Sequence, residues 1–329
     1  MGMVTGAGIT RRGGLLAGLG AMLPAGTSLA QGTWPARPVR IVVPYAPGGG
    51  TDITNRAIAE GLTQHFGRPF LVENRAGANG IIGAEVVARA QPDGYAFVGP
   101  NGTHAMLRHI TPQLPFDPIA DFSPVALLAS YCFVLVANVK EPFADVAALV
   151  AQAKARPGRI AQGTADVASG YVAAGFARAA GIELTEVRYS GSGAAVGDLT
   201  GGHLPMSWVS TATAMTLLPT GSVRPLAVTS PQRSSFLPDV PSLTELGLGA
   251  ASYIGWFGLF GPAKLPAEIT QAMNEAVNAA ARTPSVQDRL RSLAVEAYPV
   301  SSQEMAAVVA EDDRRWAQAV REGTLRASG

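Results

Sequence analysis

The residues best suited to bind a ligand form a glycine-rich run directly after an apolar segment, residues 39–43. The run consists of Pro47, Gly48, Gly49, Gly50, Thr51 and Asp52. Three successive glycines let a ligand approach the backbone closely, and a helix that begins beside them presents unpaired amides and the positive end of its dipole. Thr51 or Asp52 is suited to cap that helix. The pattern predicts a socket for an anion, since a tight turn without a ligand would need only one glycine.

Three other extended segments are followed by loops that combine glycine with hydroxyl or amide groups. These loops contain Asn101, Gly102, Thr103 and His104; Thr164 and Ser169; and Ser190 and Gly191. Open α/β sheets bind ligands at the carboxyl ends of their strands, and such groups can complete a carboxylate site. Each loop taken alone is also explained as an ordinary turn, but four of them favour a binding site.

Apolar extended segments alternate with alanine-rich helical segments, which predicts an α/β fold with helices on both faces of parallel sheets. The first helix is expected to end at Gly67. We expect strands at 39–43, 70–72, 95–98, near 160, at 184–189 and at 226–229, and helices at 81–90, 144–155, 267–282, 286–293 and 303–320. Several helices in succession at the C-terminus need a sheet on which to pack.

A chain of 329 residues is longer than one hydrophobic core usually absorbs, so two lobes are expected. We infer that residues 31–125 begin the first lobe, residues 126–254 form the second, and residues 255–329 return to the first. Ligand groups would then come from both lobes.

The first thirty residues predict export. Arg11 and Arg12 form a basic end, residues 14–23 an apolar stretch, and residues 28–30 a small-x-small cleavage site. We interpret residues 1–30 as a signal peptide cleaved after Ala30. The paired arginines are similar to a twin-arginine signal, although Gly14 stands where a bulky apolar residue is usual, so both export routes stay open.

Composition excludes several classes of partner and chemistry. With 25 basic and 24 acidic side chains the net charge is +1, which provides no basic surface for nucleic acid or an anionic membrane. The one cysteine, Cys132, lies in an apolar run and is interpreted as a buried, inert thiol. The four histidines have no metal-ligand spacing. No metal site and no cofactor are expected.

Enzymatic interpretations fail on spacing. The glycine run and Glu73 imitate a dinucleotide-binding half-domain, but the run is not G-x-G-x-x-G. No G-x-S-x-G or H-E-x-x-H motif is present. We therefore expect binding without catalysis.

An ordered set of motifs resembles the Bug family, the substrate-binding subunits of tripartite tricarboxylate transporters. The likeness covers nearly all of residues 34–323 and is carried by VPYAPGGGTD at 43–52, VENRAGANG at 72–80, PDGY at 92–95, GTH at 102–104, YSGSG at 189–193, DLTGG at 198–202, LPDVPS at 237–242 and WFGLFGP at 256–262. It implies a two-lobed periplasmic-binding-protein fold, each lobe a mostly parallel sheet flanked by helices, with the ligand in the cleft between lobes.

The resemblance also implies a function. A small carboxylate would be held largely by backbone amides and water from the first-lobe loops, in the periplasm, and delivered to a small and a large membrane subunit. We expect a monomer. An alternative with the same fold is a periplasmic sensor that presents its carboxylate to a membrane histidine kinase.

The sequence departs from the family at the second lobe. Asp166 lies in a loop where the family commonly has a histidine, and residues 204–208 end in Trp208. Trp208 is a candidate to stack on an apolar part of the ligand, although a tryptophan at this spacing is more often a core residue. Dicarboxylates, tricarboxylates, aromatic acids and amino acids all remain open as ligands.

Overall fold

The computed structural model describes residues 2, 34–189 and 192–325, and two β-sheets organise residues 35–325. The first sheet has the strand order β11-β4-β10-β3-β1-β2, and the second has the order β7-β6-β8-β5-β9. The strands are β1 (Val39–Val43), β2 (Phe70–Asn74), β3 (Ala96–Val98), β4 (Phe122–Tyr131), β5 (Phe133–Asn138), β6 (Ala161–Thr164), β7 (Thr185–Arg188), β8 (Met206–Ser210), β9 (Val223–Val228), β10 (Gly255–Pro262) and β11 (Glu296–Ala297). The predicted α/β fold with two lobes is confirmed.

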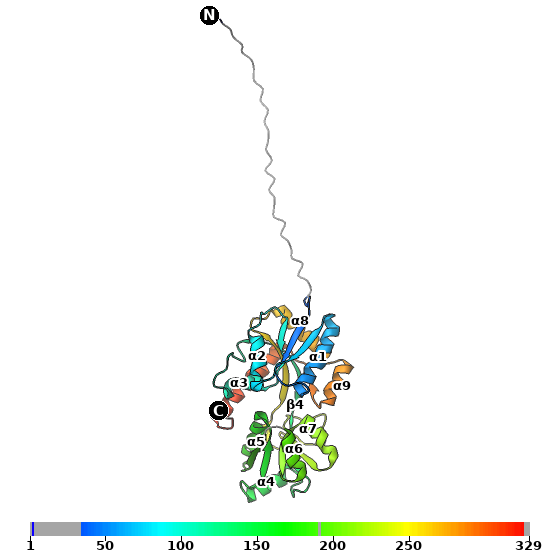
Figure 1. Ribbon diagram of the computed structural model, residues 1–329. Coiled ribbons are helices and arrows are strands. Elements are labelled where there is room, and N and C mark those ends of the chain that lie inside the picture. The colour runs from blue at the N-terminus through cyan, green and yellow to red at the C-terminus, as the bar shows by residue number, and fades with distance from the viewer. Residues whose placement is uncertain (1, 3–33, 190–191, 326–329) are drawn as a thin grey trace. The chain divides into compact units, whose positions relative to one another are not determined.

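Helices accompany both sheets (Figure 1). They are α1 (Gly50–Phe66), α2 (Ile81–Ala88), α3 (Thr103–Ile110), α4 (Val146–Ala155), α5 (Val167–Ala180), α6 (Ser192–Gly201), α7 (Thr211–Leu217), α8 (Ala267–Ala280), α9 (Pro284–Ser292) and α10 (Ser302–Arg321), with short 3-10 helices η1 (Ala78–Gly80), η2 (Leu218–Thr220) and η3 (Gly249–Ala251). Within the described part of the chain, no helix has both the length and the apolar character needed to cross a membrane.

Both sheets are mixed, which corrects the expectation of mostly parallel sheets. Strand β1 pairs in parallel with β2 and β3, but β10 runs antiparallel to both β3 and β4. In the second sheet β6 is parallel to β7 and β8, whereas β5 is antiparallel to β8 and β9. The reason is the connection between lobes: β4 leads out of the first sheet and β10 leads back into it, so they point in opposite directions.

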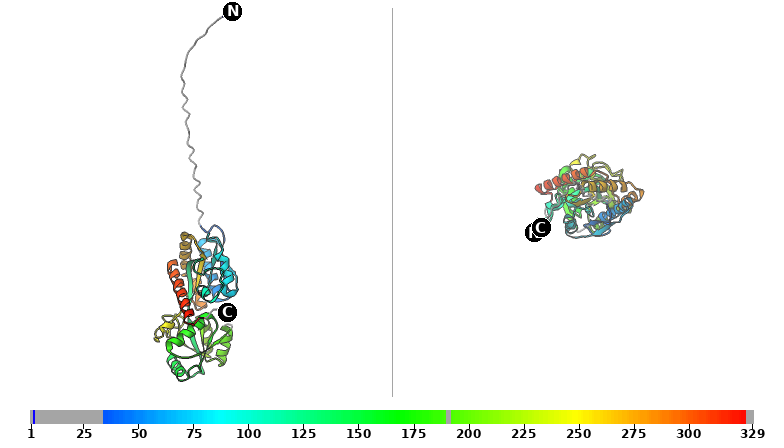
Figure 2. Two further views of the ribbon diagram at one scale, coloured as in Figure 1. Left: turned by 90° about the vertical axis from the view of Figure 1, so that its left-hand side faces the viewer. Right: turned by 90° about the horizontal axis from the view of Figure 1, so that it is seen from above.

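The three C-terminal helices return to the first sheet. Helices α8 and α10 contact β4, while α9 contacts α1 and α10 also contacts α3. In Figures 1 and 2 these orange and red helices lie beside the blue and cyan elements. The division into residues 31–125, 126–254 and 255–329 stays a prediction.

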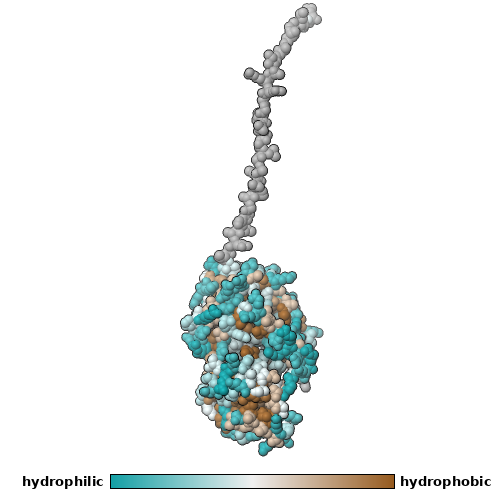
Figure 3. Space-filling view, turned by 180° about the vertical axis from the view of Figure 1, so that it is seen from behind, coloured by the Kyte–Doolittle hydropathy of each residue, from teal (hydrophilic) through white to brown (hydrophobic). Residues whose placement is uncertain are grey.

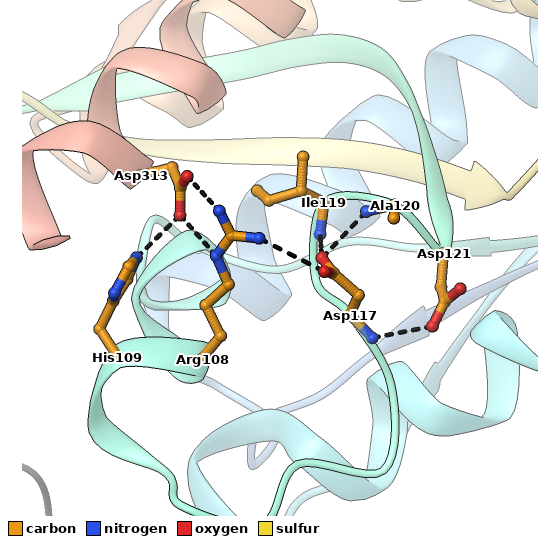
Figure 4. A network of polar contacts seen from close by, with 7 residues as sticks. All are labelled: Arg108, His109, Asp117, Ile119, Ala120, Asp121 and Asp313. Atoms are coloured by element: carbon orange, nitrogen blue, oxygen red, sulfur yellow. Dashed lines mark hydrogen bonds and ion pairs between the residues drawn. The ribbon is translucent and has the colours of Figure 1, made fainter.

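A polar network fixes α10 against α3 and the loop that follows it (Figure 4). The guanidinium of Arg108 pairs with Asp313, with 2.7 Å between Nε and Oδ1, and reaches Asp117 at 3.3 Å. Nε2 of His109 lies 2.8 Å from the same Asp313 oxygen. Burial alone would raise the pKa of Asp117, but amides of Ala120 and Ile119 together with Arg108 lower it below its usual value. Asp117 therefore stays charged, and Arg108 joins it to Asp313 on α10.

The helix after the glycine run begins earlier than expected. Gly49 is the N-cap of α1, with extended backbone and no side-chain hydrogen bond, so the predicted cap at Thr51 or Asp52 is wrong. Thr51 and Asp52 lie in the first turn instead, and both are buried. The predicted end at Gly67 is confirmed, because Gly67 adopts φ 63° and its amide donates to the Thr63 carbonyl.

The outward connection between the sheets is a single residue. Strand β4 ends at Tyr131 and β5 begins at Phe133, so Cys132 alone lies between them. Cys132 is 5% exposed, which confirms its predicted burial, and burial raises the pKa of its thiol. The segment that returns to the first sheet is hydrogen-bonded to the start of β5. Thr229 Oγ1 accepts from the Phe133 amide at 2.9 Å and donates to the Tyr253 carbonyl at 2.7 Å.

Side chains also contact one another across the lobes. The ring of Tyr171 on α5 meets Trp316 on α10 edge-on, with centroids 4.9 Å apart. Ser235 donates through its hydroxyl at 2.7 Å and its amide at 3.1 Å to Glu296 Oε1. The hydrophobic core is continuous through this region, since one buried cluster includes Val42 and Trp316 as well as Trp208.

Polar residues cover much of one face of the molecule. Figure 3 shows a face on which hydrophilic residues surround smaller apolar areas. Exposed large apolar side chains in the described chain are scattered over several elements, including Leu71 on β2, Ile82 on α2, Met215 on α7 and Val320 on α10.

Candidate functional site

The β1–α1 loop is held in shape by the carboxylate of Asp52. Its Oδ2 accepts from the Gly48 amide at 2.9 Å, and its Oδ1 accepts from Asn74 Nδ2 at 2.9 Å. Arg56 Nε donates to both oxygens, at 3.0 and 3.1 Å. Burial would raise the pKa of Asp52, but these donors together lower it, so the group stays ionised and its charge is balanced by Arg56. Asp52 thus shapes the loop and is only 3% exposed.

The glycine backbone of this loop is open on one side. Residues 46–50 are exposed, and Gly48 has φ 85°, a conformation that favours glycine. A Cβ at Gly49 would come no closer to its surroundings than 3.9 Å, from the Ala46 carbonyl oxygen. A ligand can therefore approach the backbone and the first amides of α1, which have no acceptor within the helix.

Two hydrogen-bonded links bring the β3–α3 loop against the first loop. Tyr45 donates its hydroxyl to Asn101 Oδ1 at 2.7 Å, and the same oxygen accepts from the Thr103 amide at 3.0 Å. Asn55 Nδ2 donates to the Thr51 carbonyl at 2.9 Å and the Gly99 carbonyl at 3.2 Å. A Cβ on Gly99 would lie 2.0 Å from Asn55 Oδ1, so this close approach requires glycine.

His104 turns away from these loops into the core of the first lobe. Its ring is 1% exposed and lies 4.7 Å from Phe122 and 4.9 Å from Phe260, measured between centroids. Burial lowers the pKa of His104 to about 4, despite a hydrogen bond to the Pro118 carbonyl that raises it. Its Nε2 has no hydrogen-bond partner among the described residues. The imidazole is thus neutral and enclosed by aromatic rings.

The remaining loop residues of the first lobe differ in exposure, and Gly102 is buried. Pro47 and Gly48 are exposed, Thr103 is half-buried, and Gly102 donates its amide to the Trp256 carbonyl at 3.0 Å. Gly50 faces Phe257, whose Cζ would be 3.4 Å from an added Cβ.

In the second lobe, Thr164 and Ser169 are engaged in internal hydrogen bonds. Thr164 Oγ1 donates to Glu186 Oε1 at 2.8 Å and is 2% exposed. Ser169 and Asp166 form a capping box at the start of α5, in which the Ser169 amide donates to Asp166 Oδ1 at 2.7 Å. Ser190 and Gly191 lie outside the described residues.

Trp208 occupies the core of the second lobe. It is 1% exposed, its Nε1 donates to Gln162 Oε1 at 3.1 Å, and its ring meets Phe176 with centroids 5.4 Å apart. This position agrees with the interpretation of Trp208 as a core residue and gives its ring no free face for stacking.

Tyr131 is a candidate site residue that the sequence did not single out. It ends β4, its ring covers Gly255, and a Cβ there would lie 2.3 Å from Tyr131 Cζ. Its ring is 5.3 Å from that of Phe257, which in turn faces Gly50. Burial, with a smaller contribution from the negative charge of Asp166, raises the pKa of Tyr131. No local sequence signal pointed to Tyr131, because its pairing with Gly255 joins two distant segments.

Two cavities are lined by candidate site residues, one by Tyr131 and the other by Thr164. One of about 480 Å³ lies at the lobe connection, between Tyr131, Cys132, Ser230 and Glu296. The other, of about 260 Å³, lies between the second-lobe residues Thr164, Asp166, Glu186 and Arg188, among others, and the C-terminal residues Thr324 and Leu325; we call it the second-lobe pocket. Within the described residues no group of three His, Cys, Asp or Glu side chains is placed to hold a metal ion.

Comparisons with known proteins identify relatives of this arrangement. Residues 54–325 match the model of the tripartite tricarboxylate transporter family receptor. The chain is 31% identical to protein BugT of Bordetella pertussis over 88% of this chain and 90% of that protein.

Solved structures agree with the sequence relatives. The structure of R. palustris Rpa4515 with adipate has a TM-score of 0.76 and 32% identity, covering 90% of this chain and 100% of that one. The structure of MatC from Rhodopseudomonas palustris with bound malate has a TM-score of 0.71 and 30% identity, covering 87% and 99%. The match over residues 54–325 and the shared two-lobed fold show that the chain belongs to the tripartite tricarboxylate transporter receptor family, whose members are periplasmic solute-binding proteins.

Proposed function

We propose that the protein captures a small carboxylate by closing its two lobes and delivers it to the small and large membrane subunits of a tripartite transporter. The observation that carries this proposal is the pair of first-lobe loops joined by Tyr45, Asn101 and Asn55. They offer an exposed glycine backbone and a helix N-terminus at one place. The adipate and malate in the two R. palustris structures support a carboxylate as the ligand.

The charge of the first loop is compatible with an anion. Asp52 is the acidic residue in the first turn of α1, and Arg56 neutralises it at 3.0 Å. The positive end of the α1 dipole is therefore not opposed by an unpaired carboxylate on the same helix. A carboxylate can bind backbone amides here without a dedicated lysine or arginine.

Closure is the proposed functional event because the lobes are joined through a one-residue outward connection and a longer return connection. Cys132 alone separates β4 from β5, and residues 229–254 form the return connection. Small changes of backbone angle in such segments rotate whole lobes, and a ligand contacted from both sides favours the closed state.

Export is part of the proposal, with cleavage after Ala30. Both Ala30 and the residue that follows it lie outside the described part of the chain. Mass spectrometry of the protein from the periplasm of a double-membrane bacterium should find a chain that begins near Gln31. Recovery of only the intact chain beginning at Met1, from the cytoplasm, would contradict export.

The first experiment is a thermal-shift screen of carboxylates. A ligand present at a hundred times its dissociation constant should stabilise the folded protein by about 2.7 kcal/mol. The library should contain monocarboxylates, dicarboxylates, tricarboxylates, aromatic acids and amino acids, with the corresponding uncharged amides as matched controls. Stabilisation by acids and not by their amides supports the proposal. Equal stabilisation by both, or by no acid, overturns it.

A further inference from the structure

The second-lobe pocket of about 260 Å³ is lined by more acidic than basic side chains among the described residues. It lies at the carboxyl ends of β6 and β7 and is lined by Asp166, Glu186 and Arg188. These are two carboxylates and one guanidinium among the described residues of the lining. The predicted ligand residue Thr164 lines the same pocket. The charge of this pocket therefore bears on which carboxylate the protein accepts.

Glu186 and Arg188 neutralise each other. Glu186 Oε1 accepts from Thr164 Oγ1 at 2.8 Å, and Oε2 lies 3.0 Å from Arg188 NH2. Gly170 makes room for this carboxylate, because a Cβ on Gly170 would lie 3.1 Å from Glu186 Oε1. Arg188 is thus not a free cation for a second carboxylate of the ligand.

Asp166 keeps an unshared negative charge. It is exposed, its Oδ1 accepts from the Ser169 amide at 2.7 Å, and no ion pair joins it to any described residue. Its Oδ2 receives no hydrogen bond from the described residues. The charge of Asp166 also acts on Tyr131 at the lobe connection, where it adds to burial in raising the pKa of the tyrosine hydroxyl.

Helix capping does not require this charge. Asn and Ser cap helices about as well as Asp, and in this protein Ser210 caps α7 and Ser301 caps α10. A neutral residue could therefore also cap α5, and the Asp166 carboxylate lines the pocket with one oxygen that receives no hydrogen bond from the described residues.

We propose that Asp166 is a specificity-determining residue that selects a ligand bearing one carboxylate and one ammonium group. The inference rests on the proposed function, because the carboxylate of the ligand would bind at the β1–α1 loop while its ammonium faces Asp166. A second carboxylate in that position would meet an unpaired like charge, which discriminates against dicarboxylates.

The test compares ligands that differ only at the far end. Titration calorimetry at neutral pH should be run on the purified exported protein with succinate against 4-aminobutanoate, and with adipate against 6-aminohexanoate. We expect the amino member of at least one pair to bind at least tenfold more tightly than its diacid.

Three variants separate the charge of Asp166 from its capping role. Asp166→Asn and Asp166→Ser keep a cap on α5 but remove the charge, and each should lower the preference for the amino member about tenfold. Asp145→Asn is the matched control, since Asp145 caps α4 in the same lobe through the Ala148 amide. It should leave the preference unchanged, and the melting temperature of each variant reports on folding.

The outcomes distinguish this inference from the proposed function. If diacids bind and both position-166 variants leave the ratio of affinities unchanged, the specificity role of Asp166 is overturned while carboxylate binding stands. A wild-type protein that prefers the diacid in both pairs overturns it as well. If no carboxylate of any class binds, the proposed function fails and the inference fails with it.

Discussion

Tyr45 and Asn101, at the ends of two strands of the first sheet, are joined by a hydrogen bond of 2.7 Å. Tyr45 follows β1 and Asn101 follows β3, and these strands are direct neighbours in the sheet. Asn101 Oδ1 also accepts from the Thr103 amide, so the link orients the start of α3. Two loops that the sequence separates by some fifty residues therefore form one surface.

Replacing Tyr45 with phenylalanine should loosen this surface. Asn101 Oδ1 would keep the Thr103 amide but lose its hydroxyl donor, which should cost about 1 kcal/mol of stability. We expect ligand affinity to fall several-fold, measured by calorimetry with a carboxylate found in the screen. Tyr95→Phe is the control, because Tyr95 lies in the same lobe and its hydroxyl accepts from the exposed Ala36 amide. Equal affinities for the Tyr45 variant and wild type would show that the link does not shape the site.

Gly49→Val should block the approach to the β1–α1 loop. Gly49 has φ −79° and ψ 166°, an extended conformation that valine adopts readily, and an added Cβ would have space. Folding should therefore survive while the new methyl groups occupy the exposed side of the loop. We expect binding to weaken at least tenfold, about 1.4 kcal/mol, in titration calorimetry.

The matched control for this variant is Gly197→Val. Gly197 is exposed on α6, and an added Cβ would meet nothing within 4 Å. It should bind its carboxylate as wild type does. If Gly49→Val also bound as tightly as wild type, the ligand could not lie on this loop and the second-lobe loops would become the site.

His104 should make stability depend on pH. Its pKa is about 4 in the folded protein, against an ordinary value of 6.5. The unfolded chain therefore binds a proton that the folded chain does not between these values, so stability falls as pH drops from 6.5 to 4 and changes no further below 4 on this account. The difference corresponds to roughly 3 kcal/mol.

Urea unfolding at several pH values would measure this contribution. His104→Gln keeps a possible donor to the Pro118 carbonyl but removes the titrating ring, and it should flatten the slope between pH 4 and 6.5. His203→Gln, at an exposed position in the other lobe, should leave the slope unchanged. An unaltered slope in the His104 variant would assign the pH dependence to other groups.

The sequence predicted most elements because local signals and tertiary structure agree there. The strand at 39–43 and the helix end at Gly67 match β1 and the C-cap of α1. The mixed sheets could not be predicted from local patterns, since the antiparallel pairing of β4 with β10 depends on where the chain leaves and re-enters the first sheet. Helix α1 begins at Gly50 with Gly49 as its N-cap, and Asp52 in the first turn accepts from the Gly48 amide instead of capping the helix.

Side-chain direction limited what the sequence could say about the site. Residue types alone did not show that the His104 ring packs in an aromatic cluster or that the Thr164 hydroxyl is hydrogen-bonded to Glu186. Tyr131 was equally hidden, because its contact with Gly255 joins segments more than a hundred residues apart. Contact of the ligand with the predicted residues stays a prediction.

Lobe closure makes a prediction about size in solution. Addition of a carboxylate that binds in calorimetry should lower the radius of gyration measured by small-angle scattering, because groups of both lobes contact the ligand together only in the closed state. At a ligand concentration equal to the wild-type dissociation constant, the Gly49→Val variant should compact much less than wild type because little of it is bound, whereas Gly197→Val should compact like wild type. A radius that does not change at verified saturation would leave a rigid binding protein. In that case the contacts that cross the lobes, such as Ser235 with Glu296, would hold one fixed arrangement instead of a hinge.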